Sequence, residues 1–175
     1  MITVVVGTNR KGAVSAAIAS YYIDLLENLG SRAQLLNLAE LPHDFTQSAL
    51  YGNSGKNNQV NALIDMLHKS DKFVFVVPEY NGSFPGVLKA FIDSMSYPSP
   101  FKGKKCALLG VSSGAQGGGL AISHLTDIFN YLGMHVLALK PRLAKIEENT
   151  NPHFRITNDF YLQMIKEQAD ALLLF

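Results

Sequence analysis

The sequence predicts an α/β domain built on a doubly wound parallel sheet. The chain has 175 residues, about the length of one domain, and 47% of them are hydrophobic. Runs of β-branched and aromatic residues alternate along it with segments of helical periodicity. Because such an alternation is joined by right-handed crossovers, we expect a single domain over residues 1–175, with helices covering both faces of its sheet.

Each of the five expected strands is a short run rich in β-branched, aromatic or other apolar residues. The first, from Ile2 to Val6, is a continuous β-branched run that ends at Gly7, as expected for a strand buried on both faces. The third stops at Pro78, which cannot donate to a sheet ladder. In chain order, the expected strands cover residues 2–6, 33–38, 72–77, 105–111 and 134–139.

Helical spacing of apolar residues indicates five helices between and after these strands. The first is ended by Gly30, which suits the position just beyond a helix. Pro85 suits the first turn of the helix after the third strand, where Ser83 is a possible cap, and that helix must end before Pro98. In chain order, the expected helices cover residues 14–29, 61–68, 85–95, 120–132 and 157–174, the last capped by Thr157 or Asn158.

Two stretches are too long and irregular for ordinary connections. Residues 41–58 contain Pro42, Gly52 and Gly55 and exceed the usual connection of about 4–6 residues. We expect a functional or mobile loop there, one that shapes the mouth of a substrate site. Residues 141–152 form a second such stretch.

Composition argues against several classes of function. The 15 Lys and Arg residues nearly balance the 14 Asp and Glu residues, so we expect no nucleic-acid partner. The apolar start is far shorter than the roughly 18 residues of a membrane span and lacks the basic segment of a secretory leader, so we expect no membrane insertion. The single cysteine, Cys106, favours a reducing compartment, and we expect a cytoplasmic protein. The five histidines show no metal-ligand spacing, so no metal site is expected.

The loop after the first strand, residues 7–15, is a candidate for binding a phosphate ester. In a doubly wound sheet, ligands bind beyond the carboxyl ends of the strands. This loop leads into a helix whose first N–H groups suit an anion. Thr8 and Ser15 add hydroxyl groups, and Arg10 adds a guanidinium group that can form two hydrogen bonds to a phosphate. An ordinary turn with solvent-facing polar residues is the alternative.

Two widespread phosphate motifs do not fit this loop. Gly7 and Gly12 have the spacing of a Walker motif, but Ala13 follows where the phosphate-binding lysine must stand. The dinucleotide fingerprint needs a glycine at Asn9 and an acidic residue after the second strand, where Asn37 is found. Nucleotide hydrolysis and Rossmann-type NAD binding are therefore disfavoured.

The loops after the third and fourth strands are also unusual. Residues 77–89 are rich in Pro, Gly and Asn and can present backbone groups to the edge of a flat heterocycle, with Tyr80 along its face. A rigid turn is an equally good interpretation of that spacing. Residues 110–119 carry five of the chain's 14 glycines, which permit close approach of the backbone to a ligand.

These three loops, in this order, resemble the NADPH-dependent FMN reductase family of the flavodoxin-like fold, which includes quinone, azo-compound and chromate reductases. Residues 78–89 read Pro-Glu-Tyr-Asn-Gly-Ser-Phe-Pro-Gly-Val-Leu-Lys and match the family pattern Pro-Glu-Tyr-Asn-x-Ser-x-Pro-Gly-x-Leu-Lys throughout. The resemblance covers most of the chain. It implies a five-stranded sheet of order 2-1-3-4-5, non-covalently bound FMN, and a homodimer or homotetramer.

The resemblance also assigns residues to the cofactor. It places the phosphate at the first loop, the isoalloxazine ring at the second, and the other edge of that ring at the third. The residues that correspond, in chain order, are Thr8, Arg10, Ser15, Pro78, Glu79, Tyr80, Asn81, Ser83, Ser112, Ser113, Gly114 and Gly117. Three departures predict weaker FMN binding or an altered subunit contact: Ala13 replaces a common serine, Ser15 the usual asparagine, and Leu120 an arginine.

The expected activity is that of an NAD(P)H-dependent FMN reductase or quinone reductase. We hypothesise ping-pong turnover, in which FMN takes a hydride from NADPH or NADH and then reduces a quinone, a free flavin or a similar acceptor. No side chain is required as a catalytic acid or base. Two alternatives stay open: a flavodoxin-type electron carrier, although such carriers are usually strongly acidic, and a flavin-free interaction module on the same fold.

Overall fold

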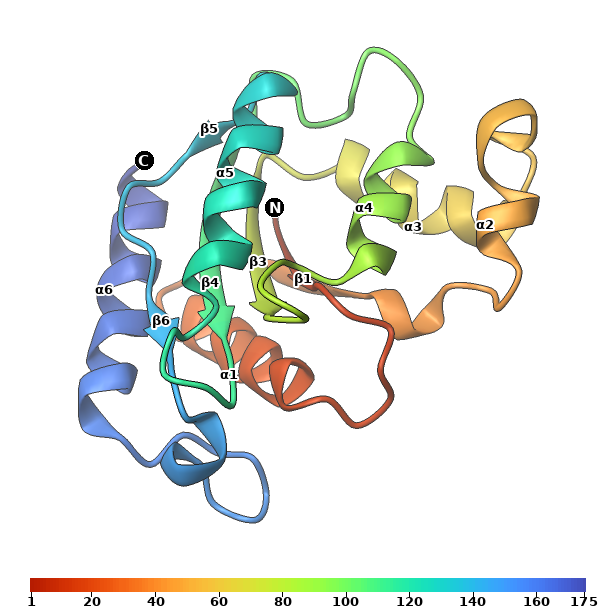
Figure 1. Ribbon diagram of the computed structural model, residues 1–175. Helices are drawn as coiled ribbons and strands as arrows, with labels where there is room; N and C mark the ends of the chain where they lie inside the picture. The colour runs from red at the N-terminus through yellow and green to blue at the C-terminus, as the bar shows by residue number, and fades with distance from the viewer.

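A parallel sheet with the strand order β2-β1-β3-β4-β5 forms the centre of the computed structural model, which describes residues 1–175 (Figure 1). This order confirms the predicted doubly wound α/β fold class. A sixth short strand, β6, pairs in parallel with the end of β4. The strands are β1 (Ile2–Val6), β2 (Ala33–Asn37), β3 (Lys72–Pro78), β4 (Lys105–Val111), β5 (His135–Val136) and β6 (Arg142–Leu143).

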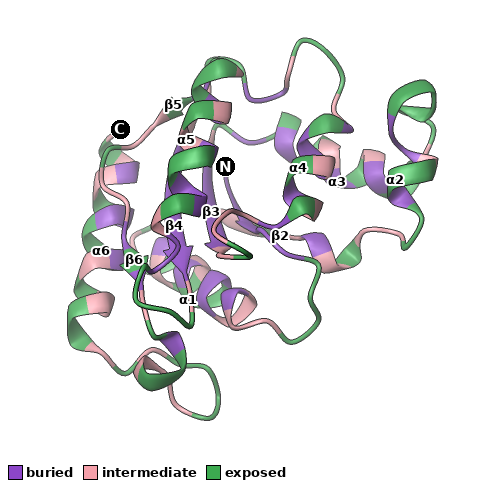
Figure 2. Ribbon diagram, in the orientation of Figure 1, coloured by how far each residue is buried: buried purple, intermediate pink, exposed green.

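Helices cover both faces of the sheet. Side chains of α1 and α6 pack on one face, and those of α3, α4 and α5 pack on the other. Figure 2 shows the buried residues on the strands and on the inward sides of these helices. The helices are α1 (Val14–Asn28), α2 (Phe45–Ser48), α3 (Asn58–His68), α4 (Gly86–Asp93), α5 (Gly119–Tyr131) and α6 (Asp159–Leu174).

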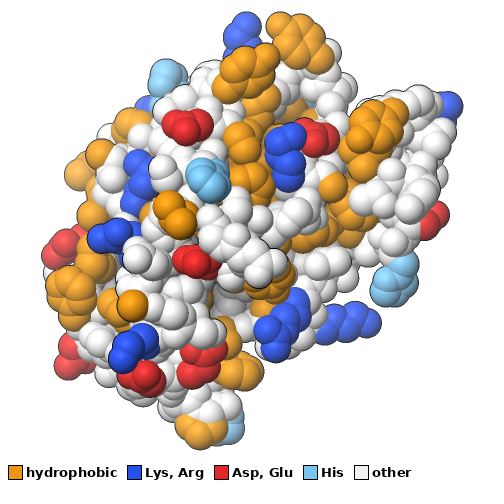
Figure 3. Space-filling model, viewed as in Figure 1, with side chains coloured by type: hydrophobic (Ala, Val, Ile, Leu, Met, Phe, Trp, Pro, Cys, Tyr) orange, Lys and Arg blue, Asp and Glu red, His pale blue; other side chains and the backbone are white.

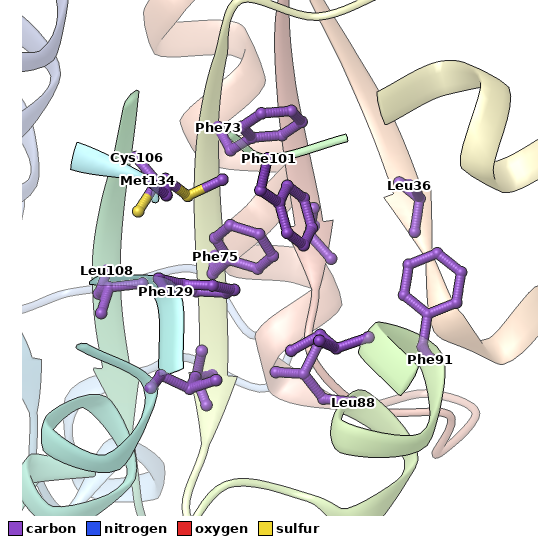
Figure 4. Close-up of a cluster of buried hydrophobic side chains, with 14 of the residues drawn as sticks. Leu36, Phe73, Phe75, Leu88, Phe91, Phe101, Cys106, Leu108, Phe129 and Met134 are labelled. Carbon is purple, nitrogen blue, oxygen red and sulfur yellow. The ribbon is translucent and has the colours of Figure 1, made fainter. Parts of the chain in front are cut away.

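The strands are buried on both faces because successive side chains enter opposite cores. In β3, Phe73 and Phe75 face α3, α4 and α5, whereas Val74 and Val76 face α1 and α6. The rings of Phe73, Phe75, Phe101 and Phe129 pack together, and the centroids of neighbouring rings lie 4.5–6.1 Å apart (Figure 4). Aromatic packing of this kind adds to the free energy gained from burying the ring surfaces.

The fifth strand is much shorter than the predicted residues 134–139. Only His135–Val136 pairs with β4; the chain then leaves the sheet and returns as β6 after Pro141. Gln168 of α6 fills the interruption: its Nε2 donates 2.9 Å hydrogen bonds to the carbonyl oxygens of Leu108 and Leu139. The buried side-chain amide of Gln168 therefore replaces backbone hydrogen bonds between β4 and the chain after β5. The spacing of apolar residues does not predict this interruption.

Other boundaries differ by a few residues, and most have a local cause. The helix expected from residue 61 begins at Asn58, because the Asn57 side chain accepts hydrogen bonds from two N–H groups of its first turn. The last helix is capped by Asn158, not by Thr157. Residues 41–58 are not structureless: they contain α2 and a 3₁₀ turn at Tyr51–Asn53, and α2 packs on α3 and α4.

The helices of this fold are short or contain charged residues. None is long and apolar enough to cross a membrane.

Replacing Gln168 by leucine is expected to lower the free energy of unfolding by about 3 kcal/mol. The substitution leaves the carbonyl oxygens of Leu108 and Leu139 without this donor and removes the acceptor of the buried Tyr22 hydroxyl, 3.2 Å away. Urea unfolding followed by circular dichroism measures the change. Gln163→Leu, on the exposed side of the same helix, is the control and should change stability by no more than about 0.5 kcal/mol. Equal effects of the two substitutions would contradict the role of Gln168.

Candidate functional site

A cavity of about 310 Å³ lies at the carboxyl edge of the sheet, where the loops after β1, β3 and β4 meet. Its size is at the lower end of the range for small-molecule sites. The segment after β6 forms the remaining wall. The lining residues are Arg10, Gly12, Ala13, Val14, Ser15, Pro78, Glu79, Tyr80, Val111, Ser112, Ser113, Ile146, Glu147 and Phe154.

The first loop brings an uncapped helix N-terminus into this cavity. Ala13 occupies the cap position of α1, no side chain caps the helix, and its first turn contains no acidic residue. The Ser15 side chain is only 2% exposed, and its hydroxyl oxygen has no hydrogen-bond partner. Since buried polar atoms are almost always paired, this hydroxyl is available to a ligand. With Arg10 beside it, the arrangement suits an anion.

The second loop is a tight two-residue turn. Tyr80 and Ser83 exchange two backbone hydrogen bonds, and Asn81 and Gly82 between them have φ values of 51° and 75°. Asn-Gly is the preferred pair for such a turn, because both central residues need positive φ. The turn is held on one side by the Tyr80 hydroxyl, 2.9 Å from Thr8 Oγ1.

The other side of the turn is held by α5. Ser83 Oγ lies 2.9 Å from Nδ1 of His124, so Ser83 does not cap the helix after it; Pro85 occupies that position. A Cβ atom on Gly82 would lie 3.9 Å from a methyl carbon of Leu120, which is one helical turn before His124. His124 is exposed, and no feature of the sequence pointed to its contact with Ser83.

The glycines of the third loop serve backbone packing. A Cβ atom on Gly110 would overlap the carbonyl oxygen of Gly117, and one on Gly117 would lie 2.7 Å from the carbonyl carbon of Arg142. The loop between β4 and α5 can therefore lie directly on β4 and β6. Ser113 Oγ donates a 2.6 Å hydrogen bond to Glu147, which ties this loop to the segment after β6.

The structure brings seven of the twelve residues assigned to the cofactor together around the cavity, and the other five lie outside its lining. Thr8 is buried behind the loops, while Asn81 and Ser83 belong to the turn that holds Tyr80. Gly114 and Gly117 belong to the packed third loop. Contact of all twelve residues with FMN stays a prediction. The seven that line the cavity are Arg10, Ser15, Pro78, Glu79, Tyr80, Ser112 and Ser113.

Three lining residues come from a segment to which the sequence analysis gave no role in the site. Ile146, Glu147 and Phe154 follow β6 and close the side of the cavity nearest α6. The unusual length of the stretch 141–152 was the one signal that pointed to this region. No residue of the stretch 41–58 lines the cavity, so the expectation that this loop shapes the mouth is wrong for the cavity described here.

Comparison with known families agrees with this geometry. A family model described as NADPH-dependent FMN reductase matches residues 1–141. The chain belongs to the NADPH-dependent FMN reductase family. The match includes the loops after β1, β3 and β4 but ends before β6, so the wall formed by Ile146, Glu147 and Phe154 lies outside it. Membership confirms the prediction of an oxidoreductase that uses NAD(P)H and FMN.

Individual relatives extend over nearly the whole chain. An NAD(P)H-dependent FMN reductase of Pseudomonas aeruginosa is 30% identical over 176 residues, covering 97% of this chain and 91% of its own length. A quinone reductase of Escherichia coli is 28% identical over 138 residues, covering 78% of this chain and 72% of its own. The solved flavoenzyme NAD(P)H:(acceptor) oxidoreductase of Paracoccus denitrificans has a TM-score of 0.76 at 25% identity, covering 98% of this chain and 94% of its own.

Gly110→Ala is expected to lower the free energy of unfolding by about 3 kcal/mol, because the new methyl group must displace the backbone at Gly117. Gly114→Ala is the matched control in the same loop: its Cβ meets nothing within 4 Å and its φ is not positive, so we expect a change below about 0.5 kcal/mol. Thermal unfolding of the two variants tests this. Equal melting temperatures would show that the close approach is not required.

Proposed function

We propose that this member of the family holds FMN in the 310 Å³ cavity and passes electrons from NAD(P)H to a small acceptor, a quinone or a free flavin. The observation that carries the proposal is the unpartnered Ser15 hydroxyl at the uncapped N-terminus of α1. A phosphate ester supplies the acceptor oxygens and the negative charge that this position lacks. The relatives named above support the choice of acceptor.

The residues around the cavity fit FMN in two regions. Arg10 and Ser15, with the first N–H groups of α1, would hold the phosphate. Tyr80, fixed by its hydrogen bond to Thr8, and the loop at Ser112 would flank the ring system. When bound, FMN accepts a hydride from NAD(P)H and delivers electrons to the second substrate.

The protein's own contribution is positioning and polarity. Three contacts hold the loops in place before any ligand binds: Thr8 with Tyr80, Ser83 with His124, and Ser113 with Glu147. Such preorganised polar groups stabilise developing charge without having to reorient during the reaction. Glu79 places one buried carboxylate oxygen without a hydrogen-bond partner at the cavity, where it can accept a hydrogen bond from a hydroxyl or ring N–H of the ligand.

We also propose that the protein is a homodimer or homotetramer that associates through α4 and α5. Ile92, Ile128 and Leu132 line a shallow apolar hollow between these helices, and Tyr131 beside them is 90% exposed. Lys89 and Asp93, which form an ion pair within the chain, and Asp127 lie in the same hollow, so a twofold axis through it would bring charges of both signs together. Light scattering that gives the mass of a monomer would contradict this.

The NAD(P)H dependence and the single cysteine favour a cytoplasmic location.

A visible spectrum of the purified protein tests the proposed function. With FMN added, we expect a protein-bound flavin spectrum that bleaches under anaerobic NADPH and recovers when a quinone is supplied. Bound flavin that NADPH does not bleach would instead indicate an electron carrier. A protein that does not bind FMN would indicate an interaction module.

The surface charge argues against an electron carrier. On the face shown in Figure 3, charges of both signs are interspersed, without the strongly acidic surface typical of carriers.

Ser15→Ala is expected to raise the dissociation constant for FMN about tenfold, about 1.4 kcal/mol, because one hydrogen bond to the phosphate is lost. The melting temperature of the FMN-free protein should not fall, since the hydroxyl has no protein partner to lose. Fluorescence titration with FMN and thermal unfolding measure the two effects. Ser31→Ala, at the far end of α1, is the control for affinity. An unchanged dissociation constant for Ser15→Ala would remove Ser15 from the phosphate site.

A further inference from the structure

A second cavity, of about 690 Å³, adjoins the site on the other side of Phe154. Phe154 lines both cavities, and one face of α1 together with residues 153–156 forms most of the larger one. This segment follows the region matched by the family model. The larger cavity therefore has one wall inside the region matched by the family model, on α1, and one wall outside it.

The residues around the larger cavity have the chemistry of a nucleotide site. Tyr21 and Phe154 present aromatic rings, on which a purine base can stack. Arg155 offers a guanidinium group for phosphate oxygens, and Asp24 offers a carboxylate for ribose hydroxyl groups. Neither Arg155 nor Asp24 forms a salt bridge in the structure, although both line this cavity.

The segment that carries Phe154 and Arg155 is held in a defined conformation. Thr150 and Ile156 form an antiparallel bridge, and the Asn151 side chain accepts hydrogen bonds from the N–H groups of His153 and Arg155, at 2.9 and 3.1 Å. Phe154 itself has a φ of 57°, which is uncommon for a non-glycine residue. A strained aromatic residue held between two cavities is a sign of a functional constraint.

The electron donor has two halves, and only one of them must lie against the flavin. NAD(P)H consists of a nicotinamide half, which must reach the flavin, and an adenosine half joined to it by two phosphates. A cavity of 310 Å³ that holds FMN has no space for the adenosine half, whereas the neighbouring cavity is more than twice as large. The side chains that line it could serve the base, the ribose and the 2′-phosphate of that half of NADPH.

We propose that the cavity between α1 and residues 153–156 binds the adenosine half of NADPH, with the 2′-phosphate on Arg155. This inference rests on the proposed function, because it assigns a second part of the same electron donor. Phe154 then separates the adenosine half from the flavin. The inference also predicts a preference for NADPH over NADH, since only NADPH carries the 2′-phosphate that Arg155 would bind.

Calorimetric titration of the FMN-loaded protein with adenosine 2′,5′-bisphosphate tests the site without turnover. We expect saturable binding that Arg155→Ala weakens at least fivefold. Arg32→Ala, an exposed arginine at the other end of α1, is the matched control and should leave the dissociation constant within twofold. No binding to the native protein, or equal binding to native protein and the Arg155→Ala variant, would overturn the proposal.

Donor kinetics distinguish this inference from the proposed function. Arg155→Ala should raise the KM for NADPH about five- to tenfold and keep the KM for reduced nicotinamide mononucleotide, which lacks adenosine, within twofold. A similar change for both donors, or for neither, would overturn the adenosine site while the oxidoreductase activity stands. A native protein that oxidises neither donor would overturn the proposed function, and this inference with it.

Discussion

The parallel ladder between β3 and β4 is the constraint on which the rest of the molecule depends. Seven residues of each strand pair in register, from Lys72 with Lys105 to Pro78 with Val111. Because successive side chains of both strands enter opposite cores, the ladder needs a layer of helices on each face. Its parallel direction places the loops after β3 and β4 side by side, so the position of the site follows from the strands.

The amino edge of this ladder contacts the end of α6, whereas its carboxyl edge borders the cavity. At the amino edge, Lys72 Nζ donates 2.9 Å hydrogen bonds to the carbonyl oxygens of Leu172 and Leu173, and Lys105 Nζ contacts the carbonyl of Phe175. Two cations thus meet the free carbonyls at the end of α6, the favourable place for positive charge on a helix. Burial and the neighbouring Lys105 lower the pKa of Lys72. At the carboxyl edge, the polar residues Glu79, Ser112 and Ser113 line the cavity.

Anchoring α6 also orders the segment that precedes it. Gln168 joins the middle of α6 to β4, and Asn158 caps its first turn. Residues 142–157 are therefore held between β4 and a helix fixed along its length. This explains how an irregular segment, which contributes Glu147 and Phe154 to the site, can have a defined shape.

The order and type of the main elements, and the location of the site, could be predicted from the amino-acid sequence. Strand periodicity and the glycine and proline stops found β1, β3 and β4 because a strand buried on both faces reads as an unbroken apolar run. The pattern from Pro78 to Lys89 indicated the family without any structure. Seven of the residues assigned to FMN line the cavity, because the ends of parallel strands meet at one edge.

Tertiary structure decided the contacts that depend on distant segments. The break between β5 and β6 follows from Gln168, which lies about thirty residues later in the chain and carries no local signal of its role. The use of Gly110 and Gly117 for backbone packing, where a ligand was expected, depends on β6 lying beside them. Glu147 and Phe154 reach the cavity only because α6 holds their segment against the sheet. Local periodicity records which side of an element is buried, but it does not record which distant residue covers it.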